Sequence, residues 1–147
     1  MKRIALLDVN VLVALFDPDH VHHEASHAWF PRNRAAGWAT CPLTENGLVR
    51  ILSNPAYGAT SEPPGAILGR LDSFCRSGGH VFWPDELSLR EARLFHRASR
   101  LSHRTVTDVY LLALALHHRG RLATFDRNIP LSAVAGAEPS HLEVIPA

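Results

Sequence analysis

The sequence predicts an α/β fold, in which a central parallel sheet of about five strands is flanked by helices. Two observations predict it: short apolar runs alternate with longer segments whose apolar residues recur at helical spacing, and turn residues separate them. Strands that alternate with helices form parallel sheets. The chain has 147 residues, 46% of them hydrophobic, so we expect one domain with its own core over residues 1–147.

Residues 4–7 are four consecutive apolar residues, which is typical of a strand buried on both faces. Asp8 follows directly, and Asp8 and Asn10 supply capping side chains for a short apolar helix that reaches Phe16. In open α/β sheets, ligands bind at the carboxyl ends of the strands. We therefore expect Asp8 to lie at a binding edge of the sheet.

The middle of the chain supplies two more predicted strands and three predicted helices. Pro31 is expected to bend or end the first of these helices, and Asn54–Pro55 to end the second. The glycines and prolines of residues 56–65 predict a loop that flanks a site. The predicted helices cover residues 22–34, 44–53 and 66–75, and the predicted strands cover residues 38–41 and 80–83.

The last third of the chain continues the alternation of helix and strand. Apolar residues at helical spacing predict a long helix over residues 105–119, and Gly120 is expected at its C′ position. The remaining predicted elements are a helix over residues 88–101 and strands over residues 122–125 and 142–145.

Composition and charge exclude several classes of protein. No apolar run approaches the roughly 20 residues that a membrane-spanning helix needs. Cys41 and Cys75 lack the spacing of a disulfide framework or a metal motif, and Asp8 and Asn10 interrupt the run that imitates a signal peptide. A net charge of +1 indicates no particular partner. We expect a soluble, cytoplasmic protein.

Four acidic residues stand at equivalent places in the predicted elements. Asp8 and Asp126 end the first and fourth strands, while Glu45 and Asp108 each lie in the first turn of a helix. On one edge of the sheet, four carboxylates would repel one another unless a divalent cation were bound among them. Mg²⁺ and Mn²⁺ prefer such oxygen ligands, lower the pKa of a bound water and neutralise charge on a leaving phosphate oxygen. The pattern therefore indicates metal-dependent phosphoryl chemistry.

Each acid also has a purely structural interpretation. Asp8 is placed to cap the first helix, and Glu45 to complement a helix dipole. Asp108 is the fourth residue of a capping box that begins at Thr105, and Asp126 suits a turn. Each explanation is sufficient for one residue, but the coincidence of the four placements favours a shared site.

These acids belong to four short motifs. The motifs are Asp8-x-Asn10 with its apolar flanks, Glu45 at a helix start, Thr107-Asp108-x-x-Leu-x-Ala-Leu-Ala, and Thr124-Phe125-Asp126-Arg127. Together they resemble the acidic signature of PIN-domain ribonucleases of the VapC toxin type, and the resemblance covers nearly the whole chain. It implies a PIN-like three-layer sandwich with strand order 3-2-1-4-5, in which the first and fourth strands are neighbours.

The resemblance also implies an activity, namely that of an endoribonuclease that is the toxin of a toxin–antitoxin pair. Such an enzyme acts as a homodimer, and a cognate antitoxin protein inhibits it. Asn10 and Thr124 would orient the acidic side chains by contacting them, without binding the metal themselves. By this resemblance, four acids bind Mg²⁺ or Mn²⁺ and catalyse the hydrolysis of RNA by a metal-activated water. These acids are Asp8, Glu45, Asp108 and Asp126.

Another motif indicates a different class of enzyme. His23-Glu24-Ala25-Ser26-His27 matches HExxH, in which two histidines bind Zn²⁺ and the glutamate is the general base of a metalloprotease. The chain has ten histidines, so a chance match is not improbable, and no obvious predicted helix supplies the further zinc ligand that such a protease requires. A third hypothesis is a noncatalytic PIN-like module that binds RNA or protein, although a pure binder gains nothing from four mutually repelling acids.

Arginines recur at spacings of three and four in and after the predicted helix over residues 88–101. On one continuous helix they would share a face, where they would follow the phosphates of an RNA strand. A solvated helix face is the alternative interpretation. The candidates for RNA binding are Arg93, Arg97, Arg100, Arg104 and Arg127.

Overall fold

A five-stranded parallel sheet forms the centre of the protein, in a computed structural model that describes residues 2–97 and 101–147. The strand order is β3-β2-β1-β4-β5, and every neighbouring pair is parallel. Both the α/β class and the strand order expected from the resemblance are therefore confirmed. The strands are β1 (Ala5–Leu7), β2 (Trp38–Thr40), β3 (His80–Phe82), β4 (Arg121–Thr124) and β5 (Leu142–Val144).

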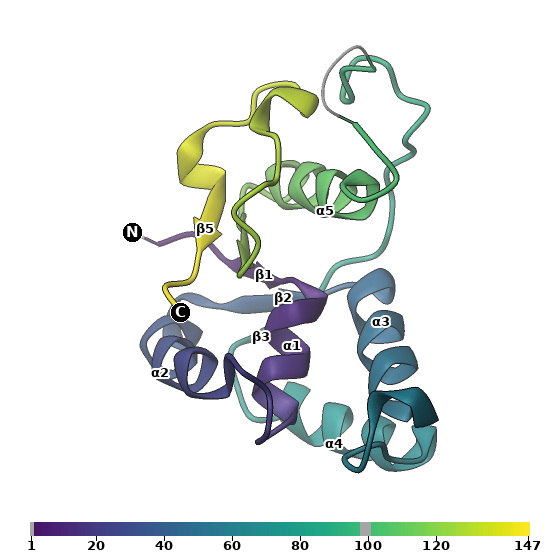
Figure 1. The fold of residues 1–147 in the computed structure, drawn as a ribbon. Helices are drawn as coiled ribbons and strands as arrows, with labels where there is room; N and C mark the ends of the chain where they lie inside the picture. Colours follow the sequence, from purple (N-terminus) through teal and green to yellow (C-terminus); the bar gives the residue numbers. More distant parts are fainter. Residues whose placement is uncertain (1, 98–100) are drawn as a thin grey trace.

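Helices cover both faces of the sheet, which gives the fold three layers (Figure 1). Successive side chains of β1 point to opposite faces: Leu7 packs in the core under α1 to α4, and Leu6 packs in the core under α5. This arrangement explains why the central strands lack polar alternation. The helices are α1 (Val9–Phe16), α2 (His23–Asn33), α3 (Pro42–Ser53), α4 (Pro64–Cys75) and α5 (Val106–His117).

The prediction of a helix over residues 88–101 is wrong for the residues that the structure describes. Residues 88–97 form turns and a short bridge. The N–H of Phe95 bonds to the carbonyl of Glu91, which closes a single helical turn. The turn does not propagate, since Phe95 then pairs in an antiparallel bridge with Val134. Backbone pairing with a segment about forty residues away has replaced the local helical pattern.

The carboxyl end of α5 also differs from the prediction. Arg119, not Gly120, takes the left-handed conformation at C′, with a φ of 56°. Gly120 is required for another reason, because a Cβ there would lie 2.6 Å from the carbonyl oxygen of Ile4 and 2.7 Å from the ring of Trp83. Gly120 is therefore required because the backbone of Ile4 and the ring of Trp83 leave no space for a side chain. Within α2, Pro31 does not end the helix, which continues to Asn33.

Candidate active site

Asp8 lies at the carboxyl end of β1 and is buried. Its carboxylate accepts the N–H of Val9 at 2.7 Å, which makes it the N-cap of α1, and the hydroxyl of Thr124 at 2.7 Å. Burial raises the pKa of Asp8 above its ordinary value, the two hydrogen bonds oppose this shift, and the nearby charge of Asp126 adds to it. The predicted capping role is confirmed, and it coexists with a contact to β4.

Asp108 and Asp126 join Asp8 at this edge of the sheet. Asp108 lies in the first turn of α5, and its pKa is raised to about 7. The largest cause is burial, followed by the negative charges of Asp8 and Asp126 and a hydrogen bond with the side chain of Asp126. Three aspartates from three elements therefore share one electrostatic environment.

The side chains of Asn10 and Thr124 connect the Asp8 carboxylate with the backbone of Asp126. Asn10 Nδ2 donates to Thr124 Oγ1 at 3.2 Å, and Thr124 Oγ1 in turn donates to Asp8. The same hydroxyl oxygen accepts the N–H of Asp126 at 3.0 Å. This network fixes the Asp8 carboxylate and the start of the turn that carries Asp126.

A cavity of about 380 Å³ opens beside this group. Asp8, Asn10 and Asp108 line it together with two residues that the sequence did not single out for the site, His20 and Tyr57. Burial lowers the pKa of His20, and the charges of His22 and His23 lower it further, against the opposing effect of Asp17. Tyr57 lies at the start of the loop over residues 56–65, which the sequence predicts to flank a site. This prediction was the one feature of the sequence that could have indicated Tyr57 as a site residue.

Glu45 belongs to a separate group of side chains. Its carboxylate accepts the hydroxyl of Thr40 at 2.6 Å, and Thr40 Oγ1 lies 2.7 Å from His80 Nε2. Cys75 from α4 completes this group. The structure thus brings together three of the four predicted acids and gives the fourth a different set of partners. The role of Glu45 as a metal ligand stays a prediction.

The two histidines of the HExxH motif contact the last turn of α1. His23 Nδ1 lies 2.7 Å from the carbonyl oxygen of Ala14, and His27 Nε2 lies 2.9 Å from that of Leu15. They thereby satisfy carbonyls that a helix end leaves without partners. Among residues 2–97 and 101–147, neither histidine belongs to a compact group of three metal-ligand side chains. The motif therefore has a structural explanation.

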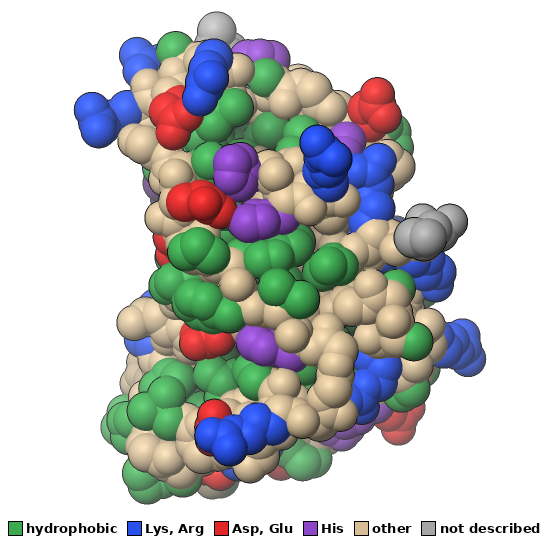
Figure 2. All heavy atoms as spheres, turned by 180° about the vertical axis from the view of Figure 1, so that it is seen from behind, with side chains coloured by type: hydrophobic (Ala, Val, Ile, Leu, Met, Phe, Trp, Pro, Cys, Tyr) green, Lys and Arg blue, Asp and Glu red, His purple; other side chains and the backbone are tan. Residues whose placement is uncertain are grey.

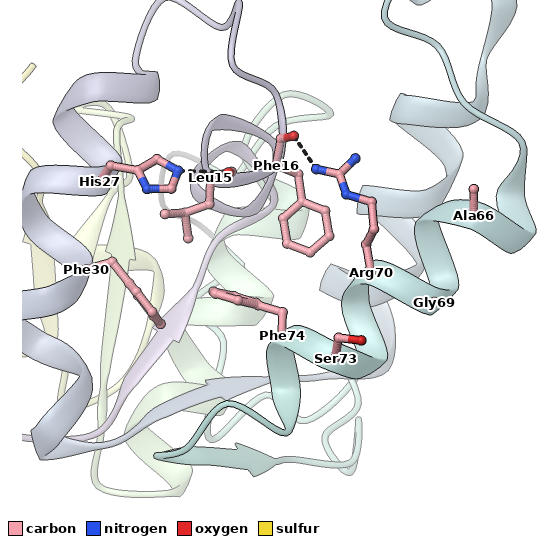
Figure 3. Close-up of a pocket in the computed structure, with 9 residues that line it drawn as sticks. All are labelled: Leu15, Phe16, His27, Phe30, Ala66, Gly69, Arg70, Ser73 and Phe74. Atoms are coloured by element: carbon pink, nitrogen blue, oxygen red, sulfur yellow. Dashed lines mark hydrogen bonds between the residues drawn. The ribbon is translucent and has the colours of Figure 1, made fainter.

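His27 also lines an apolar cavity between α1, α2 and α4 (Figure 3). Phe16, Phe30 and Phe74 extend into this cavity, and Arg70 donates to the carbonyl of Phe16 at its rim. The lining contains neither Glu24 nor any of the four predicted acids. The surroundings of His27 are therefore apolar and lack the acid that a metalloprotease would need.

The predicted arginine face is absent from the described part of the segment, because residues 88–97 form no helix. Arg93 pairs with Glu91 at 3.5 Å, and Arg97 donates to the carbonyl of Arg90. Figure 2 shows basic side chains dispersed over one face of the protein and not gathered in a stripe. Arg100 lies outside the described residues, and the remaining candidates, Arg104 and Arg127, are exposed near the starts of α5 and of the turn after β4.

Comparison with known proteins gives the family. Residues 5–136 match the PIN domain family. The chain is 43% identical to Ribonuclease VapC44 of Mycobacterium tuberculosis (strain ATCC 25618 / H37Rv) over 144 residues, which cover 96% of this chain and 99% of that protein. It is 46% identical to Ribonuclease VapC39 of the same strain over 132 residues, or 90% of this chain and 95% of that protein.

A further relative, Ribonuclease VapC38 of the same strain, is 40% identical over 126 residues, which cover 86% of this chain and 87% of that protein. The family match includes β1, α5 and β4 and all three of the clustered aspartates. The chain therefore belongs to the PIN-domain family and, within it, to the VapC type.

Proposed function

We propose that this protein is a metal-dependent endoribonuclease and the toxin of a toxin–antitoxin pair. The observation that carries the proposal is the convergence of Asp8, Asp108 and Asp126, with the pKa of Asp108 raised to about 7 by burial and by its two neighbours. Its relatives bear the name Ribonuclease VapC, which supports the same class of reaction.

The chemistry of the donor set fits a hard divalent cation, Mg²⁺ or Mn²⁺. The ligands would be Asp8, Asp108 and Asp126, with Glu45 reaching them from the first turn of α3. None of the three aspartates forms an ion pair with a lysine or arginine among the described residues. A bound cation would supply the missing positive charge, lower the pKa of a coordinated water and neutralise charge on the phosphate oxygens.

The residues of the chain then have distinct tasks in the reaction. Thr124 holds the Asp8 carboxylate by donating its hydroxyl proton, and Asn10 holds Thr124. The N–H of Asn128 donates to Asp126 Oδ1 at 2.8 Å, which fixes that carboxylate in its turn. Such supporting contacts keep acidic ligands in a geometry that is ready for the transition state.

The substrate in this proposal is RNA, and the place of action is the cytoplasm. Arg104 and Arg127 are the exposed cations nearest in sequence to Asp108 and Asp126, and we assign them to phosphate contacts. A cognate antitoxin as inhibitor and a homodimer as the active form complete the proposal. None of the helices in residues 2–97 and 101–147 is both long and apolar enough to span a membrane.

Cleavage of a structured RNA by the purified chain tests the proposal. Cleavage should require Mg²⁺ or Mn²⁺, stop in EDTA, and fall at least about a hundredfold in Asp126→Asn, because the loss of one charged group in such a site costs several kcal/mol. Asp72→Asn is the matched control, since Asp72 is an exposed acid paired with Arg76 on α4. Cleavage that persists in EDTA, or in both Asp126→Asn and Asp108→Asn, would contradict the proposal.

A further inference from the structure

Glu45, Cys75 and His80 form a compact group of three different metal-ligand side chains. They come from α3, the end of α4 and the start of β3, and their ligand atoms all lie within 4.8 Å of one another. All three residues are half-buried. The group is therefore assembled by the fold from elements far apart in the sequence, and it is separate from the three clustered aspartates.

One hydroxyl group stands at the centre of these side chains. Thr40 Oγ1 lies 2.6 Å from Glu45 Oε2 and 2.7 Å from His80 Nε2, and it also forms a side-chain hydrogen bond with Cys75. Trp38 packs against the ring of His80, with 4.7 Å between ring centroids, and so limits its rotation. The three ligand atoms already surround a common point, which lowers the entropic cost of gathering them around an ion.

The donor set is sulfur, nitrogen and carboxylate oxygen. Zn²⁺ binds cysteine, histidine and glutamate, usually four at a time with tetrahedral geometry, whereas Mg²⁺ requires oxygen ligands. Partial burial of three protein ligands leaves room for water as the fourth ligand. We propose that Glu45, Cys75 and His80 bind Zn²⁺, and that Zn²⁺ bound there inhibits the nuclease by withholding Glu45 from the acidic site.

The inhibitory half of this proposal rests on the proposed function, but the binding half does not. Zn²⁺ binding displaces the proton of the Cys75 thiol to solvent, because the thiolate is the ligand. The ion then takes over from the Thr40 hydroxyl as the link between Glu45 and His80. A carboxylate held in this way cannot join Asp8, Asp108 and Asp126 around Mg²⁺ or Mn²⁺, so the acidic site keeps three of its four ligands.

Co²⁺ titration of the metal-free protein tests the binding half, since Co²⁺ replaces Zn²⁺ and a thiolate ligand gives it a charge-transfer band in the near ultraviolet. We expect a band at one equivalent in the wild type that added Zn²⁺ removes. The band should vanish in Cys75→Ser and remain in Cys41→Ala, a control at the other cysteine, which is buried at the start of α3. A wild type without a band, or a band that survives in Cys75→Ser, would overturn the site.

Zn²⁺ inhibition of Mn²⁺-supported RNA cleavage tests the regulatory half. Half-inhibition of Cys75→Ser and of His80→Gln should need at least about ten times more Zn²⁺ than that of the wild type, because loss of a ligand weakens a metal site by at least this factor. Equal sensitivity of all three proteins would refute inhibition through this site. If the wild type cleaves no RNA, the proposed function fails, but the zinc site can still be tested. The Co²⁺ band should then be present in Asp108→Asn, a variant that alters the acidic site and keeps Glu45, Cys75 and His80, and its absence there would overturn the zinc site.

Discussion

At the scale of single residues, the Asp108 carboxyl group departs strongly from ordinary aspartate chemistry. Burial, followed by the charges of Asp8 and Asp126, raises its pKa to about 7, whereas an isolated aspartate ionises near 3.8. In the metal-free protein, Asp108 is therefore partly protonated at neutral pH. A cation among these carboxylates would favour the ionised form, which couples metal binding to proton release.

The raised pKa predicts how the stability of the metal-free protein depends on pH. The folded state binds the Asp108 proton more tightly than the unfolded chain does, so this contribution to stability is complete below the unfolded pKa of 3.8 and is lost as the pH rises through about 7. The side-chain amide of the Asp108→Asn variant stays uncharged at every pH in this range. The melting temperature of the variant relative to the wild type should therefore increase with pH.

Thermal unfolding in EDTA at about pH 5 and about pH 8 measures this difference, because the two values lie on either side of the folded pKa. Asp72→Asn serves as the reference, since Asp72 is exposed and distant in sequence from the acidic group. Its melting temperature relative to the wild type should change less between the two pH values. A relative melting temperature of Asp108→Asn that stays constant or falls with pH would show that the pKa of Asp108 is not raised in the folded protein.

At the scale of elements, the carboxyl end of α5 fits closely against β1. The N–H of Gly120 bonds to the carbonyl of Ala115, and the N–H of Arg119 bonds to that of Leu116, which closes the helix in a Schellman motif. The chain then enters β4 directly, and the N–H of Arg121 bonds to the carbonyl of Ile4. The position of β4 beside β1, and hence of Asp126 near Asp8, depends on this close passage.

Alanine substitutions at two glycines should therefore change stability in opposite directions. Gly120→Ala should lower the free energy of unfolding by about 1–3 kcal/mol, because the added methyl group meets the Ile4 carbonyl and the Trp83 ring. Gly69→Ala, at an exposed position of α4 with open space around it, should raise it by about 0.5–1 kcal/mol through helix propensity. Urea unfolding measures both values, and effects of the same sign would contradict this packing.

At the scale of the whole molecule, the sequence predicts the layers and the gathering of the aspartates better than it predicts individual contacts. Apolar runs such as residues 4–7 mark buried strands, and parallel strands bring their carboxyl ends to one edge, so Asp8 and Asp126 were expected to meet once β1 and β4 were taken as neighbours. Local pattern is sufficient here because burial on both faces leaves few alternatives.

The predictions that failed depend on contacts between distant segments. The helical pattern of residues 88–97 yields to the bridge between Phe95 and Val134, and no local signal reveals that bridge. The contacts of Glu45 also escape local pattern, since Thr40 and His80 become neighbours only when β2 and β3 pair, but its role as a metal ligand stays a prediction. His20 reaches the site cavity from the turn after α1.

Mn²⁺ binding, measured by isothermal titration calorimetry at neutral pH, most directly tests whether the three aspartates form one metal site. The wild type and Asp72→Asn should bind Mn²⁺ with the same affinity. Asp108→Asn and Asp126→Asn should each bind it at least about tenfold more weakly, as expected when a metal site loses a carboxylate ligand. Wild-type affinity in both aspartate variants would contradict a shared metal site at this edge of the sheet.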